Sequence, residues 1–453
     1  MNKLKYFIIN ESASIKQALV FLNKNMHGIL FVSDTSEKIL GAVTDGDIRR
    51  RLLDECSIHD RIDLCMNRDF IKAHPADSRE SMIKKFDNNF KVIPLIDSNG
   101  ALKKIYTQNN FPVASEQANY ARAKAPVRIS FGGGGSDLTH FFSHQRGVVL
   151  NATISLYSHA VLKKRSDSKI IIYSADLGLT IKASNLQAAL KKKSKLSLVQ
   201  AVLELANPDF GFELQLYSDF PTSSGLGGSS AITSAILGAF NEFRDDSWSE
   251  YEIAEIAFQA ERISLKISGG WQDQYACTFG GFNFMEFTAD DNLIFPLRLN
   301  KKIALELEEC LILCDTGIAH DSGDIHDDQK ISMSDSKVSE LVKSNVTNTE
   351  HIKKAMLKGD LEKFAALLDK AWNFKRKFSA KISNARLDAL YDDAKKNGAL
   401  GGKLLGAGGG GFFLFYARPF DRPALIKHLL SKNLSIVNFT FDDSGLQSWK
   451  YRE

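Results

Sequence analysis

The stretch Pro221-Thr-Ser-Ser-Gly225-Leu-Gly227-Gly228-Ser229-Ser230-Ala231 leads into a strongly periodic segment. Apolar residues at three- and four-residue spacing predict an amphipathic helix. A glycine loop entering a helix N-terminus suits an anion, because free N–H groups converge and the helix dipole favours negative charge. The hydroxyls of Ser229 and Ser230 can add hydrogen bonds or bind Mg²⁺. The simpler alternative is a capped helix after a flexible turn, which is less attractive for three glycines and two serines within six residues. The apolar positions are Ile232, Ala235, Ile236, Ala239, Phe240 and Phe243.

Two unbroken runs of four glycines flank this loop in the sequence. The chain has 31 glycines, an average number, but these runs adjoin apolar segments, which favours close-packed backbone over a flexible linker. The first run lies in Ala125-Pro-Val-Arg128-Ile-Ser-Phe-Gly-Gly-Gly-Gly135-Ser136-Asp137. Arg128 offers a fixed charge to a phosphoryl group or a carboxylate, and Asp137 can accept sugar hydroxyls. A surface salt bridge is the alternative for an isolated arginine, but Arg128 is predicted on an apolar strand.

The second run lies in Lys403-Leu-Leu-Gly406-Ala-Gly408-Gly-Gly-Gly411-Phe-Phe-Leu-Phe. Its spacing satisfies Gly-x-Gly-x-x-Gly, so a dinucleotide-binding dehydrogenase must be considered. That motif requires a helix after the glycines, whereas residues 412–416 predict a strand. The pattern therefore argues against a Rossmann domain. A Walker loop is excluded as well, because no Gly-Lys-Ser/Thr follows the first loop.

Two carboxylates stand between these segments. Glu261 is at the flank of an apolar helical stripe, where a partly buried carboxylate needs a partner such as Mg²⁺. Asp273 follows a Ser-Gly-Gly turn. A salt bridge is the alternative for either residue alone. The stripe before Glu261 consists of Ile253, Ile256, Ala257 and Ala260.

From about Arg122 to the C-terminus the chain resembles the GHMP kinases, the family of galactokinase, homoserine kinase and mevalonate kinase. The glycine loop departs from the family's pattern at Ser223 and Gly228, both small changes. The resemblance implies a two-lobed kinase that uses ATP and Mg²⁺, with Asp273 as base or orienter, Arg128 as the charge stabiliser, and Ser230 and Glu261 as metal ligands. It also implies three sets of binding residues, namely Pro221, Ser224, Gly225, Leu226, Gly227, Gly228, Ser229 and Ser230 for ATP, Gly134, Gly135, Ser136 and Asp137 for the acceptor, and Gly408, Gly409 and Gly410 in a loop that packs on the phosphate loop.

Within this family the motifs most resemble those of D-glycero-α-D-manno-heptose 7-phosphate kinases. The resemblance implies transfer to the anomeric hydroxyl of a sugar phosphate, in the synthesis of nucleotide-activated heptose or surface polysaccharide. His320 and Asp321 replace the basic residue and serines of similar kinases, so a fucose-, galactose- or mannose-type acceptor stays open, as does a decayed, non-catalytic nucleotide sensor. The basic runs at 163–165 and 191–193 are more typical of solvated surface than of a phosphate site.

The first hundred residues contain a repeat. Asp34 and Asp97 each end an apolar strand, Thr44 and Thr107 each end the next one, and both pairs are 63 residues apart. Two α/β units that share one core are predicted. This arrangement resembles a tandem CBS pair, which implies that Thr44 and Asp47 bind an adenine nucleotide or nucleotide sugar. A helix cap is the alternative, and Asn110 takes the matching aspartate position in the second copy.

Length and charge limit the remaining classes. We predict an α+β chain of 453 residues with a CBS pair at 1–112, a linker at 113–121, and kinase lobes at 122–290 and 291–453. The near balance of 58 basic and 54 acidic residues argues against nucleic acid or a membrane as the main partner. Five cysteines without a CxxC pair favour free thiols in a reducing cytoplasm. The oligomeric state stays open, with a homodimer among the alternatives.

Overall fold

The structure, a computed structural model, describes residues 3–88, 90–108, 118–221, 224–318, 322–332 and 335–451. Asn110, Ser223, His320, Asp321 and most of the predicted linker lie outside the described residues. The chain divides into two units, Met1–Glu116 and Gln117–Glu453. In the described ranges no helix is both long and apolar enough to cross a membrane.

The first unit contains the predicted repeat as two helix–strand–strand segments. In each copy the two strands pair antiparallel, with a register shift near the first strand's end. The first copy adds the parallel strand β1, which gives the order β1-β2-β3. The elements of this unit are η1 (Lys3–Tyr6), β1 (Ile8–Asn10), α1 (Ile15–Asn25), β2 (Ile29–Ser33), β3 (Ile39–Thr44), α2 (Asp45–Leu53), η2 (Ile62–Cys65), α3 (Arg79–Asp87), β4 (Val92–Ile96) and β5 (Leu102–Thr107).

The two copies share a hydrophobic core, as the repeat predicts. Phe31 and Ile39 of the first copy pack in one cluster with Val92 and Ile105 of the second. A backbone hydrogen bond of 3.0 Å from Ile39 N–H to the Gly100 carbonyl joins the copies as well. Neither small sheet buries enough apolar surface alone, so the paired arrangement supplies the missing core.

The second unit begins with β6, whose first residue Tyr120 lies inside the predicted linker. β6 pairs antiparallel with the long strand β7 and with the chain's last strand, β17. The main path of the sheet runs β12-β11-β7-β10-β8-β9. Its strands are β6 (Tyr120–Gly132), β7 (Gly147–Lys164), β8 (Ile170–Ser174), β9 (Leu179–Ala183), β10 (Phe212–Ser218), β11 (Phe282–Phe287), β12 (Asn292–Pro296) and β17 (Gln447–Tyr451).

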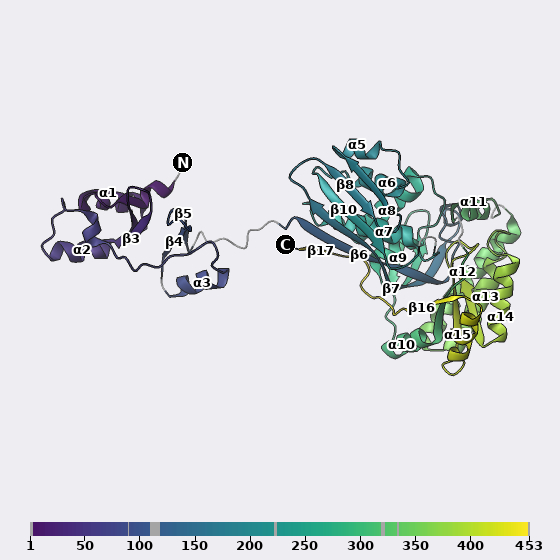
Figure 1. Ribbon diagram of the computed structural model, residues 1–453. Helices are drawn as coiled ribbons and strands as arrows, with labels where there is room; N and C mark the ends of the chain where they lie inside the picture. Colours follow the sequence, from purple (N-terminus) through teal and green to yellow (C-terminus); the bar gives the residue numbers. More distant parts are fainter. Residues whose placement is uncertain are drawn as a thin grey trace. The chain divides into compact units, whose positions relative to one another are not determined.

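Helices cover this first sheet where β6 and β7 run side by side (Figure 1). α7 contacts both strands and also α6, α8 and α9. Since α7 starts directly at the glycine loop, its burial fixes the loop against the sheet. These helices and short turns are α4 (Thr139–Phe142), α5 (Leu186–Leu190), α6 (Ser197–Ala206), α7 (Gly228–Asn241), α8 (Glu250–Phe258), η3 (Gln259–Ser264) and α9 (Gln272–Phe279).

A second sheet, in the order β14-β15-β13-β16, forms the C-terminal lobe with its helices. Phe131 of the first sheet stacks edge-on against Phe364 of α13, so the two lobes share a core. Besides strands that precede the predicted division at residue 290, the first sheet includes β12 and β17, which both follow it. The remaining elements are α10 (Lys301–Cys310), β13 (Leu311–Asp315), α11 (Ser322–Ser332), α12 (Ser336–Lys358), α13 (Leu361–Lys375), α14 (Ala385–Lys396), β14 (Ala399–Leu404), β15 (Phe412–Ala417), α15 (Arg422–Ser431) and β16 (Ser435–Val437).

Candidate active site

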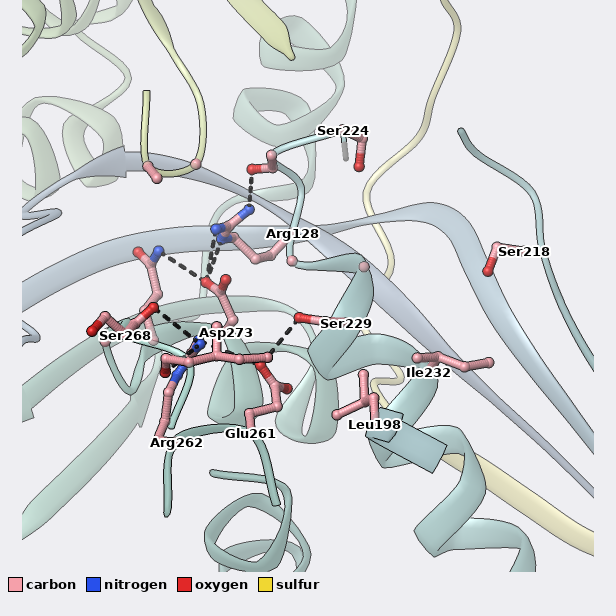
Figure 2. Close-up of a pocket in the computed structure, with 18 of the residues that line it drawn as sticks. Arg128, Leu198, Ser218, Ser224, Ser229, Ile232, Glu261, Arg262, Ser268 and Asp273 are labelled. Atoms are coloured by element: carbon pink, nitrogen blue, oxygen red, sulfur yellow. Dashed lines mark hydrogen bonds and ion pairs between the residues drawn. The ribbon is translucent and has the colours of Figure 1, made fainter. Parts of the chain in front are cut away.

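A cavity of about 580 Å³ lies in the second unit and brings the three glycine segments together. Figure 2 shows Arg128, Asp273, Glu261 and Ser229 grouped around it, with Leu198 and Ile232 toward another part of its wall. Pockets of this size typically hold a small-molecule ligand and combine an apolar wall with a few convergent polar groups. The cavity therefore suits two ligand groups of different polarity.

The loop before α7 forms one wall of the cavity. Gly225 and Gly227 have φ of +73° and +85°, a conformation that residues with a Cβ rarely adopt. Leu226 is buried, and its carbonyl accepts a 3.0 Å hydrogen bond from Arg128 N–H, so the loop is fixed to β6. Five predicted ATP-binding residues line the cavity. Leu226 and Ser230 are buried and are not among the lining residues, although Ser230 contacts the lining residue Glu261, and Pro221 is exposed and outside the lining. The lining members are Ser224, Gly225, Gly227, Gly228 and Ser229.

Glu261 meets the start of α7 at two serine hydroxyls. Ser230 Oγ donates to Glu261 Oε1 over 2.9 Å, and Ser229 Oγ donates to Oε2 over 3.1 Å. Glu261 belongs to the π-helix η3 that continues α8, and it is 1% exposed, where the sequence predicted partial burial at a helix flank. Burial raises the pKa of its carboxyl, with Arg262 opposing the rise. A buried carboxylate beside a serine hydroxyl offers the hard oxygen ligands that Mg²⁺ prefers, so the donor set fits this ion.

Arg128 connects the glycine loop to Asp273. Its Nε and Nη2 lie 2.9 and 2.7 Å from Asp273 Oδ1, and its Nη1 donates a 2.8 Å hydrogen bond to the Gly225 carbonyl. A Cβ placed on Gly227 would lie 3.3 Å from Asp273 Cγ, so this carboxylate borders the loop directly. A carboxylate and a fixed cation thus meet at the glycine loop.

Asp137 also lines the cavity. Its carboxylate accepts hydrogen bonds from Gly135 N–H at 3.0 Å and Gln272 N–H at 3.3 Å. Burial, with a contribution from the charge of Asp273, raises the pKa of Asp137. A Cβ on Gly270 would lie 1.9 Å from Asp137 Oδ2, so a side chain there would displace the Asp137 carboxylate.

The predicted acceptor residues separate into two groups. Gly134 and Gly135 line the cavity with Asp137. Ser136 does not, because its hydroxyl lies within hydrogen-bond distance of the carbonyls of Gly133 and Val148, to one of which it donates, and accepts from Val148 N–H. The structure therefore gives Ser136 a role inside the fold, where the sequence predicted an acceptor contact.

The third glycine segment reaches the phosphate loop through Gly406. A Cβ on Gly406 would lie 2.6 Å from Gly225 Cα. The predicted supporting glycines lie farther along, where Gly408 packs on Ile382 and Gly410 on the Ile318 carbonyl, while Gly409 N–H donates to the Ile382 carbonyl over 2.8 Å. The two loops thus contact each other at Gly406, near the start of the segment. Gly408–Gly410 instead pack against Ile382 and Ile318.

Sequence reasoning missed two parts of the cavity. The apolar wall comes from Leu196, Leu198 and Val199 near the start of α6, together with Ile232, residues that read as ordinary core. The other part is Lys375, whose side chain reaches the cavity from α13. Its place on the apolar stripe Leu361, Leu368, Ala371, Trp372 was a usable signal, since a lysine there must be buried.

In the first unit, Thr44 and Asp47 form a capping box at the start of α2. Asp47 Oδ2 accepts hydrogen bonds from Thr44 N–H at 2.9 Å and Thr44 Oγ1 at 2.6 Å. Burial acts to raise the pKa of Asp47, but the hydrogen bonds from Thr44 and the charge of Arg50 hold it below its usual value. The helix cap considered as the alternative is present in the structure.

Both units of the chain are similar to known protein families. The chain matches the GHMP kinases N terminal domain over residues 192–281, the GHMP kinases C terminal domain over 352–435, and the CBS domain over 1–54. It is 38% identical to D-glycero-alpha-D-manno-heptose 7-phosphate kinase of Campylobacter jejuni, over 73% of this chain and 98% of that protein.

Two further relatives agree with this similarity. A D-glycero-D-manno-heptose 1-phosphate kinase from Bacteroides thetaiotaomicron has a crystal structure that superimposes with a TM-score of 0.62 at 30% identity, over 74% of this chain and 100% of that one. The L-fucokinase/L-fucose-1-P guanylyltransferase of Bacteroides fragilis is 28% identical over 74% of this chain and 39% of that protein.

Proposed function

Because the chain belongs to the GHMP kinase family and is an ATP-dependent sugar kinase, we propose that it phosphorylates the anomeric hydroxyl of D-glycero-α-D-manno-heptose 7-phosphate. One observation carries the site assignment, namely the convergence of Asp273, Arg128 and Glu261 on the glycine loop at one cavity. The similarity to a heptose 7-phosphate kinase supports the choice of acceptor.

The proposed step is a phosphoryl transfer from ATP. The acceptor's C1 oxygen forms a bond to the γ-phosphorus while the bond from that phosphorus to the β,γ-bridging oxygen breaks, leaving ADP. The hydroxyl proton passes to Asp273, which borders the phosphate loop, and Arg128 stabilises the charge on the transferred group. Most of the acceleration would come from alignment and fixed electrostatics.

Each wall of the cavity has a part in binding. The backbone of the glycine loop would hold the phosphates of ATP, and the apolar wall near Leu198 and Ile232 would receive the nucleoside. Ser230 and Glu261 would hold Mg²⁺, which as a bound ion neutralises phosphate charge. Asp137, Gly134 and Gly135 would bind the acceptor.

ATP consumption by the full chain, measured with a panel of sugars and sugar phosphates, tests the proposal. The phosphorylated position is read by ³¹P NMR. Heptose 7-phosphate should give the highest kcat/KM and a new signal from a C1 phosphate. Preference for a fucose-, galactose- or mannose-type sugar would show that heptose 7-phosphate is not the acceptor. No turnover with any sugar or sugar phosphate of the panel would favour a non-catalytic nucleotide sensor.

We further propose that the first unit binds an adenine nucleotide or nucleotide sugar and thereby tunes the kinase. The CBS match over residues 1–54 and the Thr44–Asp47 pair at a helix N-terminus support this role. Regulation requires unequal binding to two kinase states. The full chain and its Thr44→Val variant should differ in AMP affinity and in the response of kcat/KM to AMP, and identical responses would contradict the proposal.

A further inference from the structure

Lys375 is a buried cation to which the proposed transfer step assigns no role. Among the described residues that line the cavity, the C-terminal lobe contributes Gln329, Lys375, Gly406 and Ala407, and Lys375 alone of these is charged. The residue is 6% exposed. Keeping an ammonium in such a place costs free energy unless it has oxygen partners.

The fold holds this ammonium close to residues that the proposal assigns to binding and activating the acceptor. Lys375 lies close enough to Arg128, Asp137 and Asp273 for all three to influence its titration. Nζ donates a hydrogen bond to the carbonyl of Gly406, the glycine that packs on Gly225 of the phosphate loop. The cation therefore lies near the groups that the proposed step uses.

Its hydrogen-bonding capacity exceeds what the described residues use. An ammonium has three N–H donors, and the Gly406 carbonyl is its one hydrogen-bond partner within the described part of the chain. Lys403 shows the contrasting case, since it is 3% exposed, donates over 2.6 Å to the Ser130 carbonyl, and lies off the cavity lining. Of these two buried lysines, Lys375 can reach a bound molecule.

We propose that Lys375 binds an oxygen of the acceptor sugar from the C-terminal lobe and so determines how tightly the acceptor is held. This inference rests on the proposed sugar kinase function and adds a specificity-determining residue to it. The contact is made to a hydroxyl or a phosphate oxygen, both of which accept hydrogen bonds from an ammonium.

The first test replaces Lys375 with methionine in the full chain and measures KM for acceptor and ATP separately. The matched control is Lys370→Met, the same change at an exposed position of the same helix. We expect acceptor kcat/KM to fall roughly 10- to 100-fold for Lys375→Met, the range for losing a hydrogen bond to a charged group, with ATP KM and the control within about 2-fold. A loss confined to the phosphorylated sugar identifies a phosphate contact, and equal losses with and without that phosphate identify a hydroxyl contact.

A second test uses pH and does not depend on the methionine variant folding. Burial and, to a smaller extent, the charge of Arg128 lower the pKa of Lys375, against the opposing charges of Asp137 and Asp273, to about 8. Lys403 is the other buried lysine nearby. Because the charged form makes the contact, acceptor kcat/KM should fall as pH rises through about 8, and Lys375→Arg should remove that limb.

Three results with the variants would overturn the inference. The first is a folded Lys375→Met variant with wild-type acceptor KM, and the second is an equal rise of its KM for acceptor and for ATP. The third is a pH limb that persists in Lys375→Arg. Each would show that Lys375 has a structural role only. If the wild-type protein phosphorylates none of the sugars, the proposed function fails and the inference fails with it. That outcome is visible before any variant is measured.

Discussion

The N-termini of α2 and α7 each combine a hydroxyl with a carboxylate, and they differ in where the carboxylate comes from. At α2, Thr44 and Asp47 are three residues apart and bond to each other. At α7, Ser229 and Ser230 face Glu261, which follows them by more than thirty residues and comes from another helical segment. The Asp47 side chain is 23% exposed and that of Glu261 1%.

The pKa values of the two carboxyls move in opposite directions for a physical reason. Local hydrogen bonds lower the pKa of Asp47 despite some burial, so its charge stabilises the folded state. Burial raises the pKa of Glu261, so its charge costs the ligand-free protein stability. A carboxylate that chain neighbours satisfy is a structural cap, whereas one that the fold buries at a cavity wall is suited to a cation.

Replacing Asp273 with asparagine should have the largest effect on the kinase side of this comparison. The variant loses the proton acceptor beside the phosphate loop, so kcat should fall about 10²- to 10⁴-fold. Steady-state turnover, with circular dichroism as the folding check, measures it. Asp290→Asn, at an exposed loop position, should leave kcat unchanged. Near-wild-type turnover in folded Asp273→Asn would remove this residue from the mechanism.

Glu261→Gln tests whether the buried carboxylate serves a ligand at the expense of stability. We expect kcat to fall about 100-fold and the Mg²⁺ concentration for half-maximal activity to rise. Since the folded pKa is raised, Glu261 destabilises the protein increasingly as pH rises through that pKa. The neutral variant should therefore melt about 2–4 °C higher at neutral pH. A lower melting temperature together with unchanged Mg²⁺ dependence would make Glu261 a structural residue like Asp47.

Gly406→Ala tests how far the α7 site depends on distant backbone. The new Cβ would overlap Gly225 Cα at 2.6 Å and displace the phosphate loop, so ATP KM should rise about 10-fold. Gly178→Ala is the matched control, because Gly178 also has a positive φ (+62°) but nothing within 4 Å of its added Cβ. The Gly178→Ala control should lose only about 1 kcal/mol of folding stability, through backbone strain, and should keep its ATP KM. Equal ATP KM values in the two variants would show that the loops do not depend on each other.

Asp47→Asn should have the smallest effect and the sign opposite to Glu261→Gln. Loss of the cap interaction should cost about 1 kcal/mol of stability at neutral pH, with nucleotide-free kcat unchanged. Because the folded pKa of Asp47 is lowered, its contribution is present above the unfolded pKa and disappears as pH falls. Chemical denaturation of wild type and variant at pH 7 and pH 3 would measure it. A stability difference that is no smaller at pH 3 than at pH 7 would contradict this account.

The sequence alone determined the features that depend on neighbouring residues. The glycine loop and α7 were predictable, since positive φ and apolar periodicity are local properties, and the strand after Gly411 was predictable from its apolar run. The two-copy core of the first unit followed from the repeat at 63 residues.

Tertiary structure decided everything that required distant residues to meet. Arg128 and Asp273, which form an ion pair, are 145 residues apart. Glu261 is buried because the helix becomes a π-helix at Gln259–Ser264, and the spacing of apolar residues in the sequence does not predict that change. β12 and β17 joined the first sheet across the predicted lobe division, and Lys375 reached the cavity because a helix of the other lobe packs there. Local propensity fixes the elements of this protein, but long-range packing places its charges, since the free energy of a buried charge depends on partners that the neighbouring sequence does not specify.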